Sequence, residues 1–139
     1  AADIVEARIL LETNAVRSVV AHPESVARLI ESLHTNLAAH RDSTSDDAEF
    51  ARVDAEFHQL IVGCGGNELL AGFFATLGER HRRMTTTSLH RDAGVSARIF
   101  DDHAELIAAI ERGDAEAFSS SLTNHLSAVH NIRHAGGQR

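Results

Sequence analysis

Residues 99–126, IFDDHAELIAAIERGDAEAFSSSLTNHL, decide the fold of this chain. Apolar residues recur at steps of three and four on both sides of Gly113-Asp114, which predicts two helices folded back on each other about a turn. His103 lies about ten residues before this turn, and His125 about eleven residues after it. Residues equidistant from the turn of an antiparallel helix pair lie side by side, so the two histidines are predicted to face each other.

A second polar pair lies on an apolar stripe earlier in the chain, in the segment VDAEFHQLI. Asp54 and His58 are one helical turn apart, so their side chains share one face of the predicted helix. Phe50, Phe57 and Ile61 continue this face. A buried carboxylate without a partner would be costly there. The pair is therefore expected to find polar partners inside the fold.

A metal ion would satisfy both polar pairs at once. One histidine on an apolar stripe is usually a core residue bonded to a carbonyl or carboxylate, but two facing histidines and an inward Asp-x-x-x-His pair favour a shared divalent cation. Imidazole and carboxylate ligands suit Zn²⁺ best, with Ni²⁺, Mn²⁺ and Fe²⁺ as alternatives. The predicted ligands are Asp54, His58, His103 and His125.

Two arginines near these stripes are candidates for binding the carboxylate of a small effector. Arg98 lies in the turn before His103, and Arg80 follows the apolar pair Phe73 and Leu77. A guanidinium pairs with a carboxylate in bidentate fashion. The alternative for each arginine is an ordinary solvated surface residue. The remaining histidines follow no consistent inward register: His22, His34, His40, His81, His90, His130 and His134.

The composition limits which kinds of protein this chain can be. The chain has 139 residues, 43% of them apolar, and one proline, which fits a single domain over residues 1–139. Its formal net charge of −7 argues that these residues do not bind DNA themselves. The sequence contains no apolar run of about eighteen residues and no signal-peptide pattern, so we expect no membrane association. The lone Cys64 fits a cytoplasmic location.

Helical periodicity continues through the chain without period-two alternation, which predicts an all-α antiparallel bundle of about six helices. In the first helix the apolar residues form a row at Ile4, Leu11, Ala15 and Val19, with a flanking row at Val5, Ile9, Val16 and Val20. In the fourth helix Phe73 and Phe74 are both expected to be buried. The predicted helices span residues 2–21, 23–41, 46–63, 68–89, 95–112 and 114–133, followed by a frayed tail.

Three segments together resemble a known family. They are ARILLETNAV in the first helix, DAEFHQLIVGCGGNELL at 54–70 and DHAELIAAIERGDAEAFSSSLTNHL at 102–126. The chain resembles the FCD domain, the C-terminal effector-binding domain of the fatty-acid-regulator subfamily of GntR-type bacterial transcription regulators. The resemblance covers essentially the whole chain. Its metal-binding members carry one Asp and three His, and these fall on the four ligands predicted above.

The resemblance implies a function in regulation. It implies a bound divalent metal, a small carboxylate effector beside it and a homodimer whose effector state alters DNA binding by an attached domain. Such regulators carry an N-terminal winged helix-turn-helix, which is absent from these residues. DNA binding is therefore expected only through a domain outside this chain.

Two other interpretations stay open. The first is a metal-dependent enzyme, since three His and a carboxylate are also found in hydrolases and oxygenases. No further inward acid or base is evident once Asp54 and His58 bind the metal, so we assign no catalytic residue and expect no enzyme. The second is a purely structural dimerisation domain in which the metal only stabilises the fold.

Overall fold

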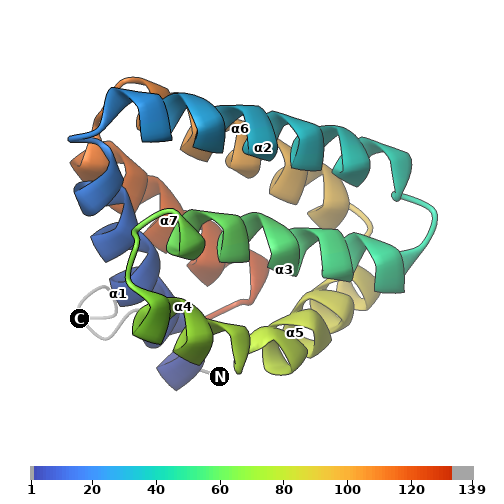
Figure 1. Ribbon diagram of the computed structural model, residues 1–139. Helices are drawn as coiled ribbons and strands as arrows, with labels where there is room; N and C mark the ends of the chain where they lie inside the picture. Colours follow the sequence, from blue (N-terminus) through green and yellow to red (C-terminus); the bar gives the residue numbers. More distant parts are fainter. Residues whose placement is uncertain (1, 133–139) are drawn as a thin grey trace.

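The computed structural model describes residues 2–132, and in this range the chain forms helices joined by short turns, without strands (Figure 1). The all-α bundle expected from the sequence is confirmed. It has seven helices over the described residues: α1 (Ala2–Val19), α2 (Pro23–Asp42), α3 (Asp47–Gly63), α4 (Glu68–Ala75), α5 (Gly78–Arg91), α6 (Val95–Glu111) and α7 (Ala115–Val129). The tail after residue 132 lies outside this range.

The fourth predicted helix is two helices, α4 and α5, which meet at an angle (Figure 1). Thr76 ends α4, where its hydroxyl donates to the carbonyl of Phe73 at 2.6 Å. Gly78, a poor helix former, begins α5. The break turns Phe73 outward, so its side chain is 53% exposed and the expectation that it is buried was wrong. Phe74 is 4% exposed, as expected.

The turn between α6 and α7 has the predicted form. Gly113 adopts φ +70°, the left-handed region that favours glycine after a helix. Asp114 then caps α7, and its carboxylate accepts a hydrogen bond from the backbone N–H of Ala117 at 2.9 Å. α6 and α7 consequently run antiparallel in contact with each other, which brings His103 and His125 to the same level.

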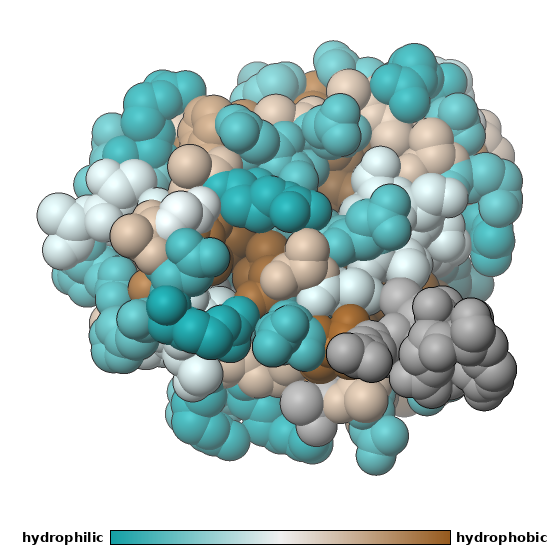
Figure 2. Space-filling view, turned by 180° about the vertical axis from the view of Figure 1, so that it is seen from behind, coloured by the Kyte–Doolittle hydropathy of each residue, from teal (hydrophilic) through white to brown (hydrophobic). Residues whose placement is uncertain are grey.

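α3 occupies the centre of the bundle, in contact with α1, α2, α4 and α5 (Figure 1). Its Phe57 and Ile61 are fully buried against Leu33, Leu106 and other apolar residues of the neighbouring helices. Figure 2, a view from the side of α6 and α7, shows mostly hydrophilic residues, with hydrophobic ones visible in a central hollow. In the described range, no helix is long and apolar enough to cross a membrane.

α1 departs from its predicted pattern. Of the predicted apolar row, Ile4, Ala15 and Val19 are buried, whereas Leu11 is only half-buried. The interior positions between them belong to Arg8 and Glu12, each 0% exposed. These charged residues continue the inward stripe at steps of four, which a search for apolar residues alone does not detect.

Candidate metal centre

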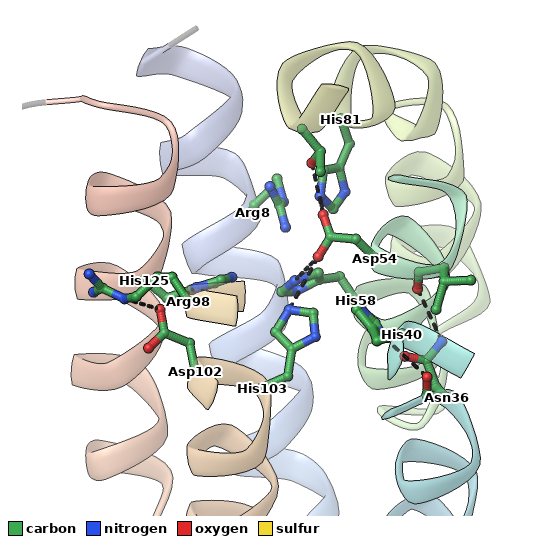
Figure 3. Close-up of polar contacts among 12 residues, drawn as sticks. Arg8, Asn36, His40, Asp54, His58, His81, Arg98, Asp102, His103 and His125 are labelled. Carbon is green, nitrogen blue, oxygen red and sulfur yellow. Dashed lines mark hydrogen bonds and ion pairs between the residues drawn. The ribbon is translucent and has the colours of Figure 1, made fainter. Parts of the chain in front are cut away.

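The four predicted ligands converge in the interior of the bundle. Asp54 and His58 come from α3, His103 from α6 and His125 from α7 (Figure 3). One ligand atom from each lies within 4.8 Å of all the others, and all four side chains are buried. Residues separated by up to 71 positions in the chain therefore meet at one point.

The donor atoms at the centre are better placed to bind a cation than to form hydrogen bonds with one another. The Nε2 atom of His103 lies 3.2 Å from Oδ1 of Asp54, and Nε2 of His58 lies 3.5 Å from the same oxygen. Among the described residues, none of these three buried atoms has a hydrogen-bond partner of good geometry. Buried polar atoms are normally satisfied. A divalent ion held by two imidazoles, a carboxylate and His125 would satisfy them together.

A carboxylate behind His58 orients its ring. Nδ1 of His58 donates to Oε1 of Glu12 at 2.5 Å, and both side chains are fully buried. This leaves Nε2 facing the centre. Burial lowers the pKa of His58, but the negative charge of Glu12 outweighs this effect and raises it. Carboxylates placed in this way increase the basicity of a ligating imidazole.

A second carboxylate orients His125. Its Nδ1 donates to Oδ2 of Asp102 at 2.8 Å, and Asp102 in turn accepts a hydrogen bond from Nε of Arg98 at 2.7 Å (Figure 3). Burial lowers the pKa of His125 despite this carboxylate. Its ring is therefore neutral near pH 7, the form that binds metals. His125 and His58 thus share one arrangement, in which a carboxylate hydrogen-bonds to Nδ1 of a predicted ligand.

The outer oxygen of Asp54 is held by α5. Oδ2 accepts hydrogen bonds from Nε2 of His81 and from the hydroxyl of Thr85, both at 2.8 Å. Burial alone would raise the pKa of Asp54, but the neighbouring rings of His81, His103 and His58 hold this pKa well below its ordinary value. Asp54 is therefore an anion at neutral pH, with Oδ1 turned to the centre.

His103 packs on an aromatic ring, and no carboxylate of the described residues hydrogen-bonds to its Nδ1. Its ring stacks on Phe57, with centroids 3.8 Å apart and an interplanar angle of 13°. The ring of His40 approaches the His103 ring edge-on, with centroids 4.8 Å apart. Burial holds the pKa of His103 well below its ordinary value, so the ring is neutral. Packing, rather than a hydrogen bond, fixes the direction of this predicted ligand.

Several residues of this site were not expected from the sequence. His40 and His81 are 0% and 2% exposed, so the statement that they lack an inward register was wrong. Glu12 and His81 are a buried acid and a buried base, so the expectation that the core holds no further acid or base was also wrong. His81 was detectable in the sequence, because it follows Phe74 and Leu77 on one helix face. Asp102 gave a weaker signal, its position directly before the predicted ligand His103.

The two candidate effector arginines lie at the edges of the site. The Arg98 side chain is 48% exposed and pairs with Asp102, behind His125. Arg80 is exposed on α5 and lines a surface hollow of about 470 Å³ beside α1 and the end of α7. Cys64 is half-buried, and burial raises the pKa of its thiol to about 11, as suits an unreactive residue.

Known proteins resemble this chain over nearly its whole length. The chain is 28% identical over 135 residues to the HTH-type transcriptional repressor NanR of Enterobacter sp. (strain 638), an alignment covering 94% of this chain and 50% of that protein. It is 27% identical over 137 residues to the protein of the same name from Escherichia coli (strain K12), with coverages of 94% and 49%. The chain spans about half the length of the curated relatives it matches.

A family model agrees with this likeness. The FCD domain model matches residues 3–128, which includes all seven helices except the ends of α1 and α7. The resemblance seen in the sequence is thereby confirmed, and the four converging residues all lie within the matched range. The chain therefore belongs to the FCD domain family, the regulatory-domain family of GntR-type transcription regulators.

Proposed function

We propose that this chain is the effector-sensing domain of a bacterial transcription regulator and that it binds a small organic carboxylate beside a buried divalent metal ion. Membership of the FCD family and relatives named as transcriptional repressors support the regulatory role. DNA would be bound by a winged-helix domain outside this chain, in a homodimer. The net charge of −7 agrees that these residues do not contact DNA.

One observation carries the metal proposal: four buried ligand atoms lie within 4.8 Å of one another. Asp54, His58, His103 and His125 would hold the ion. We propose Zn²⁺ because neutral imidazoles and one carboxylate are typical zinc ligands; Ni²⁺, Mn²⁺ and Fe²⁺ accept the same set. An ion with more than four ligands would also accept an oxygen atom of the effector.

The chain's own residues would transmit the signal. The ligands join α3, α6 and α7, and Glu12 adds α1 through its hydrogen bond to His58. An effector that contacts this cluster better in one arrangement of the helices than in another would shift their equilibrium. If the dimer geometry follows the helices, effector binding and DNA binding are coupled.

The experiment uses the full-length regulator purified without added metal. We expect about one equivalent of metal per chain by mass spectrometry and loss of that metal in His103→Ala. The exposed His34→Ala is the matched control, which keeps its metal. A folded His103→Ala protein that bound effector and released operator DNA like the wild type would contradict the proposal.

A structural metal is the second candidate, because the cluster is enclosed. The four residues are at most 2% exposed, as in closed structural sites. A structural site predicts that a chelator lowers Tm strongly, while no organic acid raises it. Sensing predicts that both change Tm. An enzyme is less well supported, since Glu12 and His81 already hydrogen-bond to the ligands His58 and Asp54.

A further inference from the structure

His103 differs from the two other predicted histidine ligands in what stands behind its ring. The Nδ1 atoms of His58 and His125 each hydrogen-bond to a carboxylate. Nδ1 of His103 is buried and has no hydrogen-bond partner among the described residues, while its Nε2 lies 3.2 Å from Oδ1 of Asp54. A histidine that binds a metal through Nε2 carries a proton on Nδ1, and this N–H group normally donates to an acceptor. His103 therefore needs an acceptor beside Nδ1 when a metal is bound.

His40 of α2 has a buried nitrogen that is suited to accept this bond. Its Nδ1 lies 3.1 Å from the backbone carbonyl oxygen of Asn36, one turn earlier in α2 (Figure 3). A carbonyl oxygen only accepts hydrogen bonds, so Nδ1 carries the proton of the neutral ring and Nε2 has a lone pair. This Nε2 atom is buried and makes no hydrogen bond with any described residue. The neutral ring of His40 thus presents an unused acceptor inside the bundle.

The rings of His40 and His103 are in contact. Their centroids are 4.8 Å apart, and their planes are inclined at 81°. A hydrogen bond between two imidazole nitrogens leaves rotation about the line joining them unrestricted, so perpendicular rings are compatible with it. The structure shows no such bond, but the χ2 torsion of histidine is soft, so small rotations of these rings align the donor with the acceptor. One buried donor and one buried acceptor, both unsatisfied, therefore belong to neighbouring rings.

Packing and hydrogen bonds hold His40 beside His103. The ring of His40 packs edge-on against Phe50, with centroids 5.0 Å apart. Asn36, whose carbonyl accepts from His40, is itself fixed to α3, because its side-chain amide donates to the backbone carbonyl of Val53 at 3.0 Å. The acceptor is thus held in position by the fold itself, as is required of a group that orients a metal ligand.

We propose that His40 is a positioning residue for His103, with Nε2 of His40 accepting a hydrogen bond from the Nδ1–H group of His103. This inference rests on the proposed function, in which His103 binds the metal. The bond satisfies both buried nitrogens at once. It continues through the His40 ring to the backbone carbonyl of Asn36. It thereby connects α2, which contributes none of the four predicted ligands, to the cluster formed by α3, α6 and α7.

The first experiment measures zinc affinity by competition with a chelator of known affinity. We compare the wild type with His40→Phe, which keeps a flat ring in the core but has no ring nitrogen, and with His34→Phe, an exposed position on the same helix. His40→Phe binds zinc about tenfold more weakly than the wild type, at the lower end of the range for such supporting groups. His34→Phe binds zinc like the wild type. His40→Gln recovers most of the affinity, because its amide oxygen replaces Nε2 as the acceptor.

A purely structural role of His40 gives different results. Without metal, Tm of His40→Phe is equal to that of the wild type or higher, because the substitution removes a buried nitrogen that has no partner. A lower Tm of the metal-free His40→Phe protein, with unchanged zinc affinity, would mean that His40 only packs in the core. Equal losses of zinc affinity in His40→Phe and His40→Gln would mean that the shape of the ring matters and the acceptor does not. Either result overturns the proposal.

NMR of the histidine ring nitrogens in the isotope-labelled, zinc-treated wild type observes the bond directly, so it does not depend on the folding of a variant. We expect a proton on Nδ1 of His103, none on Nε2 of His40, and a scalar coupling between these two nitrogens. A proton on Nε2 of His40 makes it a donor and overturns the proposal.

The remaining outcomes separate this inference from the proposed function. Equal zinc affinity in His40→Phe and the wild type overturns the role of His40 and leaves the metal site intact. A wild type that binds no zinc refutes the metal site and the positioning role together.

Discussion

Glu12 of α1 and His58 of α3 hydrogen-bond at 2.5 Å in the fully buried interior, although 46 positions separate them in the chain. We expect Glu12→Gln to weaken zinc binding about tenfold to a hundredfold, because a supporting carboxylate raises the basicity of a ligating imidazole. Competition with a chelator of known affinity measures this. Glu6→Gln, an exposed position on α1, is the control. Unchanged affinity in Glu12→Gln would contradict a supporting role of the Glu12 carboxylate.

Asp102 supports His125 in the same manner, but its side chain is 19% exposed. Asp102→Asn should therefore lower zinc affinity by about tenfold, at the lower end of the range for such partners. Arg98→Met, which leaves the Asp102 carboxylate in place, should have a smaller effect. A larger loss of zinc affinity in Arg98→Met than in Asp102→Asn would contradict the supporting role of the Asp102 carboxylate.

Metal removal should destabilise the domain. Binding at a thousand times the dissociation constant contributes about 4 kcal/mol, so a chelator should lower Tm of the wild type by several degrees. The chelator should have no effect on His103→Ala, which lacks one ligand. Calorimetry with and without chelator is the measurement. An equal drop in both proteins would place the bound metal elsewhere.

Stability of the chelated protein should fall in mild acid. The pKa of His130 is lowered from 6.5 to about 3, first by burial and then by the charge of Arg8. Below pH 6.5 the unfolded chain takes up this proton and the folded chain does not, so stability decreases as the pH falls toward 3. One such histidine contributes about 2 kcal/mol of this loss by pH 5.

Urea unfolding of His130→Gln at pH 7 and pH 5 tests this contribution, with the exposed His22→Gln as control. The variant should lose less stability than the wild type between these pH values. His58 acts in the opposite direction, since its pKa is raised in the folded chain. An identical pH dependence in His130→Gln and the wild type would show that His130 titrates normally.

The turn between α6 and α7 requires glycine. Gly113 has φ +70° and no atom within 4 Å of the position that a Cβ would take, so Gly113→Ala is strained by its backbone alone and should cost about 1 kcal/mol. Gly72→Ala in α4, where space is also open, should instead stabilise the protein by up to about 1 kcal/mol. Opposite signs in thermal unfolding are expected, and equal signs would contradict the role of the turn.

Helical periodicity was sufficient to predict the bundle, because the burial of one face repeats every three to four residues. It also predicted that His103 and His125 would face each other, since a glycine turn fixes the register of adjacent antiparallel helices. The position of the break at Thr76 was not predictable in this way. Propensity alone does not decide whether a helix bends, and packing turned Phe73 outward.

The sequence by itself therefore determined the helical class and the family, together with the four residues that converge, because local periodicity and turn chemistry specify them. Only the tertiary structure decided which groups stand behind those residues. Glu12 meets His58 and His81 meets Asp54 across different helices, and the guanidinium of Arg8 makes no hydrogen bond among the described residues. Such contacts depend on how helices distant in the chain pack, and a charged residue on a buried stripe looks the same in sequence as one facing solvent.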